Sequence, residues 1–349
     1  MPTQAKGWGT DAADQPLKPM TFERRDLRAN DVAIQISHCG ICHSDLHFAR
    51  DDWGNSRYPL VPGHEIVGIV TAVGDDVGNY RVGDKVAVGC LVDSCRECAA
   101  CQAGQEQFCA NGFTPTFAGI DRVDGSITQG GYSDHILVRE EFVCSIPDSL
   151  DIARAAPLLC AGITTYSPLR KFKVGPGSRV GVAGLGGLGH MGVKIARAMG
   201  AHVTMITTSP DKGNDARELG ADAVLLSTDG DAMAATAGKF DFILDTIPVG
   251  HDLDPYLALL APNGALVMVG AIEPLPSVHG GALIMGNKTL AGSLIGGLPE
   301  TQEMIDFCAE HGILPEVETI AIGQVNEAYE RLLKNDVRYR FVIDMSRGL

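Results

Sequence analysis

The sequence predicts an α/β protein with two domains, one a barrel of short antiparallel strands and the other a doubly wound parallel sheet. Three observations support this. The chain has 349 residues, more than one ordinary hydrophobic core accommodates. Up to about Leu150, short β-like runs are separated by glycine-containing turns. Beyond that point, short apolar runs alternate with segments of helical periodicity.

The strands expected in the first domain are Val32–Ser37, Ile66–Val73 and Lys85–Val88. Turn residues separate them at Gly74–Asp76 and Val82–Asp84. Short strands bounded by such turns are typical of an antiparallel, barrel-like domain.

The second domain is expected to hold about six strands, at Arg179–Ala183, His202–Thr207, Ala223–Leu226, Phe240–Asp245, Ala265–Gly270 and Leu290–Leu294. Helical spacing lies between them, at Leu188–Met199, Asp211–Leu219, Asp231–Ala237 and Leu253–Leu260. This alternation predicts βαβ units and a doubly wound dinucleotide-binding sheet. The chain closes with expected helices at Glu300–His311 and Val325–Asn335 and a strand at Arg340–Ile343.

Composition disfavours several classes of protein. The mean hydropathy is +0.07, and no apolar run approaches the roughly 20 residues that a membrane helix needs. The segment Met1–Met20 lacks the apolar core of a secretory signal, so we expect a cytoplasmic protein. The net charge of -15 disfavours nucleic acid and anionic membranes as partners.

Ten cysteines are many for a cytoplasmic chain, where clustered thiols more often bind metal than form disulfides. Four of them crowd together at Cys95, Cys98, Cys101 and Cys109. Two Cys-x2-Cys steps let successive sulfurs converge, and the fourth thiolate can close a tetrahedron around a structural zinc ion. Iron–sulfur ligation uses similar steps, and two disulfides or free thiols are the remaining alternatives.

Three separate motifs suggest a second metal site. They are Gly40-Ile-Cys42-His43-Ser44-Asp45-Leu46-His47, Gly63-His64-Glu65 and Cys160-Ala-Gly162. Two sulfurs and one nitrogen would leave a fourth position for water or substrate, as a catalytic zinc ion requires. Each motif alone is a weak signal, and their conjunction is what favours the site.

A glycine-rich loop indicates the cofactor. Gly184, Gly186 and Gly189 form G-x-G-x-x-G between an expected strand and helix, with Gly187 and Leu188 inside the loop. The glycines permit the tight turn and let backbone N–H groups approach a pyrophosphate.

The end of the next strand favours NADP(H) over NAD(H). NAD enzymes place a carboxylate there for the ribose 2′-hydroxyl. This chain instead has Thr207, Thr208 and Ser209, followed by Lys212, which suit a 2′-phosphate. Asp211 would favour NAD(H) if the register shifted, although it also suits a helix N-terminus.

Together these motifs resemble the zinc-containing medium-chain alcohol dehydrogenases, within them the cinnamyl alcohol dehydrogenases and their bacterial aldehyde reductase relatives. The segments that carry the resemblance cover nearly the full length in the family's order: Gly40–His47, Val61–Glu65, Cys95–Cys109, Gly184–Gly189 and Tyr339–Asp344.

The resemblance implies specific site residues. Cys42, His64 and Cys160 would be the catalytic zinc ligands, Glu65 the carboxylate that exchanges onto the metal, and Asp45 the acceptor that orients His64. Ser44 would start a proton relay that passes through the cofactor ribose to His47. The residues implied near the pyrophosphate are His43 and Arg340. Cys39 is no ligand in the family and suits a buried position.

The resemblance also implies the architecture. A GroES-like β-barrel catalytic domain would comprise residues 1–153 and 296–349, with a Rossmann domain at 154–295 inserted between its two segments. Family members are usually dimers or tetramers, so we expect a homodimer. The apolar segment Leu290–Ile295 could extend a sheet across the twofold axis.

The implied reaction moves a hydride between NADP(H) and a primary alcohol or aldehyde. An apolar wall of Phe48, Trp53, Cys90 and Phe113 would suit aromatic or medium aliphatic aldehydes. Phe48 departs from the glutamine common at that position. The alternatives are an NAD-dependent polyol or sugar dehydrogenase of the same superfamily, a zinc-free quinone reductase and a non-catalytic NADP-binding protein. The last two would be expected to lack the candidate ligands.

Overall fold

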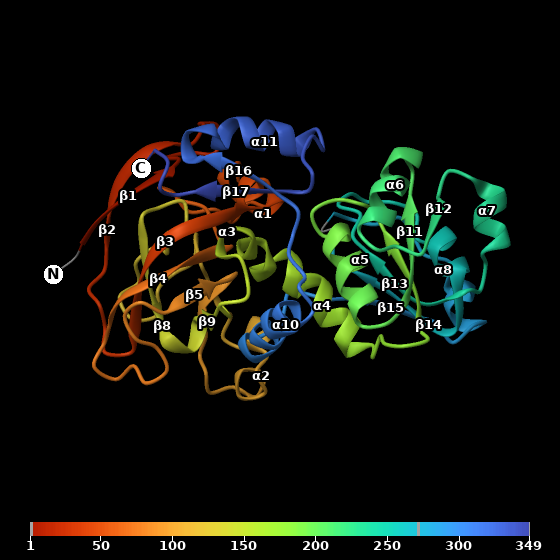
Figure 1. Ribbon diagram of the computed structural model, residues 1–349, viewed down its shortest axis with the longest axis horizontal. Coiled ribbons are helices and arrows are strands. Elements are labelled where there is room, and N and C mark those ends of the chain that lie inside the picture. The colour runs from red at the N-terminus through yellow and green to blue at the C-terminus, as the bar shows by residue number, and fades with distance from the viewer. Residues whose placement is uncertain (1–2, 271–272, 349) are drawn as a thin grey trace. The chain divides into compact units, whose positions relative to one another are not determined.

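The computed structural model describes residues 3–270 and 273–348, which form two compact units (Figure 1). The first unit comprises Met1–Cys160 with Gly296–Leu349, and the second comprises Ala161–Ile295. The first boundary thus follows Cys160, where the sequence suggested residue 153. Of the helices in the described part of the chain, none combines the length and apolar character that a membrane span requires.

The first unit is mainly β-structure. Its strands are β1 (Thr3–Gly9), β2 (Lys18–Arg24), β3 (Asp31–Ile41), β4 (Ile66–Val73), β5 (Lys85–Val88), β6 (Leu91–Asp93), β7 (Thr114–Pro115), β8 (His135–Arg139), β9 (Cys144–Ser145), β16 (Val317–Ala321) and β17 (Arg340–Asp344). Its α-helices are α1 (His43–Ala49), α2 (Ala99–Gln102), α3 (Ile152–Ala155), α10 (Leu298–Glu310) and α11 (Val325–Leu333). Short 3-10 helices lie at η1 (Glu106–Phe108), η2 (Glu140–Phe142), η3 (Ala156–Leu159) and η4 (Ile322–Gln324).

A seven-stranded sheet organises this unit, in the order β16-β17-β3-β4-β5-β9 with β8 also paired to β3. The pairing is antiparallel, as expected, except that β16 and β17 run parallel. Val32, Ile34 and Ile36 on β3 point into the core and are almost completely buried. The C-terminal strand β17 pairs with the end of β3, so the two ends of the chain build one sheet.

The sequence missed or shortened some strands. The expected Val32–Ser37 continues as β3 to Ile41, because the residues after Ser37 pair with β17 from the distant C-terminus, and His38 and Cys39 also pair with β4. The hairpin of β1 and β2 carries alternating exposed polar residues with few apolar ones, so its periodicity gave a weak signal.

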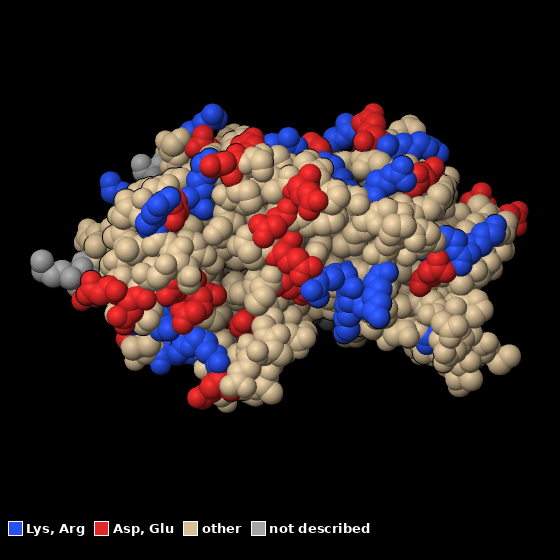
Figure 2. Space-filling model, turned by 60° about the horizontal axis from the view of Figure 1, so that its bottom comes forward, with Lys and Arg blue, Asp and Glu red and all other residues tan. Residues whose placement is uncertain are grey.

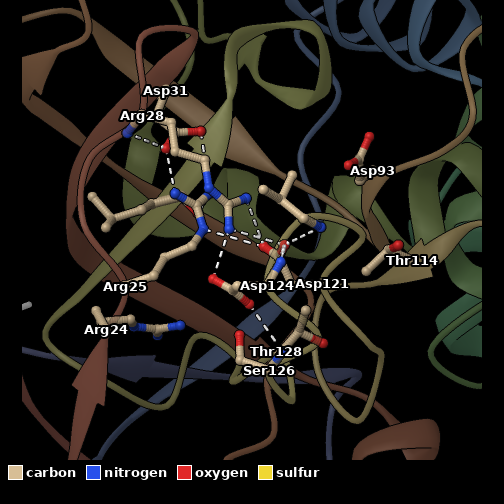
Figure 3. Close-up of polar contacts among 12 residues, drawn as sticks. Arg24, Arg25, Arg28, Asp31, Asp93, Thr114, Asp121, Asp124, Ser126 and Thr128 are labelled. Atoms are coloured by element: carbon tan, nitrogen blue, oxygen red, sulfur yellow. Dashed lines mark hydrogen bonds and ion pairs between the residues drawn. The ribbon is translucent and has the colours of Figure 1, made fainter.

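An ion-pair network anchors the loop that runs from β7 towards β8. Figure 3 shows Arg25 and Arg28 directed towards Asp31, Asp121 and Asp124. Arg28 lies 2.9 Å from Asp121 and 2.7 Å from Asp124, and Arg25 pairs with Asp31 and Asp121. A network of this kind restrains a loop more than one exposed pair would.

The second unit confirms the expected parallel sheet, with strand order β12-β11-β10-β13-β14-β15. The strands are β10 (Arg179–Ala183), β11 (His202–Thr207), β12 (Ala223–Leu226), β13 (Phe240–Asp245), β14 (Leu260–Met268) and β15 (Thr289–Gly292). The helices are α4 (Ala161–Lys171), α5 (Gly189–Ala198), α6 (Pro210–Glu218), α7 (Gly230–Ala235), α8 (Asp254–Leu259) and α9 (Gly280–Ile284). Chain order reverses between β10 and β13, which is the topological switch point where doubly wound sheets bind dinucleotides.

Charge is mixed on the surface that Figure 2 draws. On that face, small groups of acidic side chains lie next to small groups of basic ones.

Candidate metal centres and cofactor site

Helix α1 organises the first cluster of metal-ligand side chains. Cys42 is its N-cap, in an extended conformation, and its backbone N–H donates to Asp45 Oδ2 at 2.8 Å. Asp45 Oδ1 accepts from the backbone N–H of Gly63 at 2.9 Å and lies 3.0 Å from His64 Nδ1. Asp45 therefore ties the two motifs together. A carboxylate can only accept, so His64 Nδ1 donates and the ring's Nε2 is left to bind a metal.

Cys42, His64, Glu65 and Cys160 each offer a ligand atom, and these atoms all lie within 4.8 Å of one another. Cys42 Sγ and Cys160 Sγ are 3.9 Å apart. A tetrahedral zinc ion with Zn–S bonds of about 2.3 Å would separate two sulfur ligands by about 3.8 Å. The spacing therefore fits the metal, and Cys160 reaches the cluster from the end of η3.

The Glu65 carboxylate is fully buried beside the sulfurs. One oxygen pairs with Arg340, which is itself 3% exposed, whereas Oε2 is buried without a hydrogen-bond partner. A Cβ on Gly40 would lie 1.9 Å from Glu65 Oε2, so only glycine leaves room for the carboxylate here. An unpartnered buried oxygen in a set of soft ligands is a further feature that fits a metal ion.

The electrostatics favour one thiolate in this set, on Cys42, because the hydrogen bond with Cys42 raises the pKa of Cys160 well above its usual range. The hydrogen bond with Cys160 is the largest influence holding the pKa of Cys42 well below its usual range, and His64 and Arg340 act in the same direction against burial. Burial raises the pKa of Glu65 to about 7 although Arg340 lowers it. Arg340 thus compensates charge at this cluster. Its predicted pyrophosphate contact stays a prediction.

The candidate relay residues also lie on α1. Ser44 Oγ is 3.8 Å from Cys42 Sγ. His47, one turn further along, places Nδ1 2.7 Å from Asp52 Oδ2, and its ring stacks 6.2 Å from that of His43. Both His43 and His47 are half-buried. The predicted roles of Ser44, His47 and His43 remain predictions, and the structure adds Asp52 as the partner that orients His47.

A row of aromatic rings runs towards His64. Trp53 meets Phe48 edge-on at 5.1 Å, Phe48 meets Phe117 at 5.2 Å, and Phe117 lies 5.7 Å from the His64 ring. Cys90 lies beside η3, with Sγ 3.7 Å from the Leu159 carbonyl oxygen. Among the described residues, two of the four predicted pocket residues, Phe48 and Trp53, thus belong to this row by their ring contacts. Phe113 precedes β7 and takes no part in it.

The four-cysteine loop forms a second, closed cluster. The four sulfurs lie within 4.8 Å of one another, with Cys95 and Cys101 at 3.9 Å and Cys98 and Cys101 at 3.5 Å. Backbone N–H groups point at three of them: Cys98 N–H at Cys95, Ala110 N–H at Cys98 and Cys95 N–H at Cys109, each at 3.4 Å. Hydrogen bonds of this kind stabilise thiolates. They are the largest cause that lowers the pKa of Cys95 to about 6. This set fits a four-sulfur metal site.

The glycine loop in the second unit has the geometry expected of a cofactor turn. Gly184 has φ +89°, which L side chains rarely adopt. A Cβ on Gly189 would lie 1.9 Å from the Gly184 carbonyl oxygen, whereas one on Gly186 would meet nothing within 4 Å. Gly187 and Leu188 complete the turn into α5 and are half-buried. The open side at Gly186 is where a pyrophosphate can approach the backbone.

The residues predicted to choose between cofactors surround the end of β11. Thr207 is buried and accepts from the Ser209 N–H at 3.3 Å, whereas Thr208 is exposed and Ser209 half-buried. Lys212 lies in the first turns of α6, half-buried, and Asp211 is an exposed first-turn residue. Asp211 thus lies in the first turn of α6. The sequence allowed this position as the alternative to a contact between Asp211 and the cofactor ribose.

Sequence reasoning missed three residues of the first cluster. Phe117 lies four positions beyond the predicted Phe113, and Asp52 five beyond His47, and neither spacing carries a known signal. Gly40 was quoted inside a motif, but its closeness to Glu65 depends on the pairing of distant segments.

Comparison with known proteins agrees with this geometry. Residues 28–148 match the family model "Alcohol dehydrogenase GroES-like domain", and residues 187–310 match "Zinc-binding dehydrogenase". The aldehyde reductase YahK of Escherichia coli is 53% identical over 341 residues, covering 97% of both chains.

Two solved structures are similar over almost the whole chain. A cinnamyl alcohol dehydrogenase from Sorghum bicolor has a TM-score of 0.96 at 46% identity, covering 99% of each chain. The CAD from Helicobacter pylori, complexed with NADP(H), has a TM-score of 0.93 at 43% identity, covering 100% of each. These findings confirm the GroES-like and Rossmann architecture and the resemblance drawn from the motifs. The chain belongs to the zinc-binding alcohol dehydrogenase family and is an oxidoreductase.

Proposed function

We propose that the chain is a zinc-dependent, NADP(H)-preferring alcohol dehydrogenase that reduces aldehydes and oxidises primary alcohols. The observation that carries the proposal is the convergence of Cys42, His64, Glu65 and Cys160 ligand atoms within 4.8 Å, around a buried carboxylate oxygen that lacks a partner. One nitrogen and two sulfurs leave a coordination position open, which distinguishes a catalytic site from the closed four-cysteine site.

Cys42, His64 and Cys160 would hold the zinc ion, which when bound polarises a carbonyl oxygen and stabilises developing negative charge. Asp45 keeps the His64 ring in the orientation and tautomer that present Nε2. Glu65 is poised to move onto the metal, and Arg340 balances its charge when it does not.

Ser44 and His47 are proposed to deliver the proton that completes aldehyde reduction. The Ser44 hydroxyl lies beside the ligand Cys42 and so is near where a substrate oxygen would be held. His47, held through Nδ1 by Asp52, keeps Nε2 available to exchange a proton with solvent. The cofactor ribose would link these two residues.

NADP(H) preference rests on the second unit. The glycine loop would receive the pyrophosphate, and Thr207, Thr208, Ser209 and Lys212 would surround the 2′-phosphate. The similarity to a structure complexed with NADP(H) supports this choice. Replacing Lys212 by glutamate should lower the NADPH over NADH preference about tenfold by charge repulsion, while Asp211→Asn, at an exposed neighbour, should leave it nearly unchanged.

Aromatic or medium aliphatic aldehydes are the proposed substrates. Phe48 and Trp53 give an apolar surface that leads through Phe117 to His64, and Cys90 adds a small apolar neighbour beside η3. The place of Phe113 in this apolar wall remains a prediction.

The proposal is tested by initial rates of NADPH and NADH oxidation with cinnamaldehyde, benzaldehyde and a linear aldehyde, before and after zinc removal by a chelator. We expect zinc-dependent turnover that favours NADPH. Faster turnover with NADH would refute the proposed cofactor preference but not the proposed zinc-dependent reduction of aldehydes. If zinc-loaded protein reduces none of the three aldehydes but oxidises a polyol with NAD⁺, the chain is a polyol dehydrogenase instead.

We further propose a homodimer that pairs the edge strand β15 of two copies, in a reducing compartment such as the cytoplasm. Ile284 and Met285 beside β15 are 79% and 89% exposed, and Leu294 is 48% exposed. All ten cysteines are unpaired thiols, as the two metal clusters require. Sedimentation should give a dimer, and Met285→Lys with Leu294→Lys should shift it towards monomer.

A further inference from the structure

Asp245, which is buried, and His251, which is half-buried, lie side by side at the carboxyl edge of the parallel sheet, and neither has been assigned a role so far. Asp245 ends β13 and stands level with Ala183, the last residue of the neighbouring strand β10. Chain order reverses between these two strands, so Asp245 lies at the switch point of the sheet. Asp245 is 1% exposed and the His251 side chain 16%.

The loop that follows Asp245 is joined to the glycine loop. The Thr246 N–H donates to the Ala183 carbonyl at 2.9 Å, and its hydroxyl lies 2.8 and 2.9 Å from the Ala183 and Gly184 carbonyl oxygens. On the other side, a Cβ on Gly270 would lie 2.6 Å from the Ile247 carbonyl oxygen. The 246–250 loop is therefore closely enclosed where it starts.

Asp245 and His251 fix the rest of this loop. Asp245 Oδ1 accepts from the Ile247 N–H at 3.1 Å, and Oδ2 lies 3.1 Å from His251 Nε2. His251 Nδ1 lies 2.9 Å from the Val249 carbonyl oxygen, inside the loop that the pair spans. Asp245 Oδ2 and His251 Nε2 are both buried and make no hydrogen bond to a described residue with the geometry found here, so their contact has only the distance of an ion pair.

The hydrogen bonds determine where the protons must be. A carbonyl only accepts, so His251 Nδ1 carries a hydrogen. A neutral ring would then turn the lone pair of Nε2 towards a carboxylate lone pair at 3.1 Å, which is repulsive. The contact is favourable only when the pair holds one more proton, either on His251 as imidazolium or on Asp245 as acid. Burial, which raises the pKa of Asp245, favours retention of that proton.

The loop lies on the side of the switch point where the nicotinamide half of a bound dinucleotide would be expected. In this fold the adenosine ribose lies at the end of the second strand, here β11, and the pyrophosphate at the glycine loop between β10 and α5. The other half of the cofactor must then continue towards the β13 side.

We propose that Asp245 and His251 are a proton-sharing positioning pair that holds the 246–250 loop in the form that receives the nicotinamide half of the cofactor. The inference rests on the proposed function.

Other titratable groups around the pair are Tyr256, whose ring meets His251 edge-on at 5.5 Å, and three carboxylates that accept backbone N–H groups: Glu273 from Gly250, Asp252 from Asp254 and Asp254 from His279.

The test compares the dissociation constants of NADPH and of 2′,5′-ADP, which lacks the nicotinamide half. His251→Ala should weaken NADPH about tenfold and leave 2′,5′-ADP within about twofold, because only one half of the cofactor meets the loop. Asp245→Asn should bind NADPH as the wild type does at neutral pH, since its amide can donate to the unprotonated Nε2. His202→Ala, at an exposed position of the same unit, is the control.

The pH profile separates positioning from simple stability. Wild-type NADPH affinity should fall as pH rises and the shared proton is lost, whereas Asp245→Asn, which shares no proton, should not follow that fall. Equal weakening of both ligands by His251→Ala, unchanged NADPH affinity, or a wild-type pH profile in Asp245→Asn would overturn the proposal. If the wild type prefers NADH, the proposed cofactor is wrong, and the same comparison with NADH and AMP still decides the role of the pair.

Discussion

The two clusters of metal-ligand side chains in the first unit are assembled in opposite ways. The four cysteines lie within one short stretch of chain, from Cys95 to Cys109, and backbone N–H groups of that stretch point at their sulfurs. The other cluster draws Cys42, His64 and Cys160 from distant segments, and its supporting partners are side chains, Asp45 and Arg340.

The difference shows what each cluster can do. A local loop with four sulfurs and N–H donors closes a metal from all sides and adds stability to the loop. A site assembled over long range keeps an open position and a movable carboxylate, and it depends on the whole fold for its geometry. Changes at the four-cysteine cluster should therefore affect folding, and changes at the cluster of Cys42, His64 and Cys160 should affect turnover.

The largest expected effect on turnover comes from His64→Ala. Loss of the nitrogen ligand should lower kcat/KM for aldehyde reduction at least about 1,000-fold, because the metal stabilises the charge that develops in the reaction. His311→Ala, at an exposed position of the same unit, is the matched control. Full activity in His64→Ala would remove this histidine from the metal site.

A smaller effect is expected from Asp45→Asn. In the wild type, the carboxylate accepts from the N–H groups of Cys42 and Gly63 and from His64 Nδ1. The amide that replaces it keeps only one acceptor oxygen, and its NH2 group would face one or more of these donors. His64 therefore loses its fixed orientation. Zinc affinity or kcat should fall about 10- to 100-fold, as for other partners of ligating histidines. Competition with a chromogenic chelator measures the affinity, and a wild-type value for both quantities would contradict the role of Asp45.

Gly40→Ala tests the carboxylate. Its Cβ would lie 1.9 Å from Glu65 Oε2, so Glu65 must shift and kcat should fall about tenfold. Gly78→Ala introduces the same methyl group where nothing lies within 4 Å, and it should leave kcat unchanged. Equal kcat values for the two variants would mean that Glu65 takes no part in turnover.

The smallest effect on turnover per folded molecule is expected from Cys98→Ser, which should have the largest effect on stability. Losing a sulfur ligand should lower the melting temperature by about 10 °C, because loss of a bound metal is among the most destabilising single changes. The value of kcat should stay within about twofold. A variant with wild-type stability and reduced turnover would reverse the assignment of the two clusters.

The sequence predicted elements best where one local pattern decides the structure. The strands Arg179–Ala183, His202–Thr207 and Phe240–Asp245 have the predicted bounds, because buried parallel strands are short apolar runs between turns. The extension of β3 to Ile41 could not be seen, since it depends on pairing with β17 some 300 residues later, a separation that no local window covers.

The same distinction holds for the sites. The four-cysteine loop and the glycine turn could be predicted from the sequence because spacing alone brings their atoms together. The packing of Phe117 on His64 and the pairing of Glu65 with Arg340 required the fold, because residues far apart in sequence supply them. Asp245 and His251 escaped notice for a different reason: a lone aspartate at a strand end and a lone histidine six residues later carry no motif.

The most direct test of the two-cluster account is the number of zinc ions per chain, measured by native mass spectrometry on the wild type, His64→Ala and Cys98→Ser, with NADPH-dependent aldehyde reduction assayed on the same samples. The account predicts two ions in the wild type and one in each variant, with activity lost in His64→Ala and kept in folded Cys98→Ser. A wild type with a single ion, or a His64→Ala protein that holds two and reduces aldehydes, would contradict it.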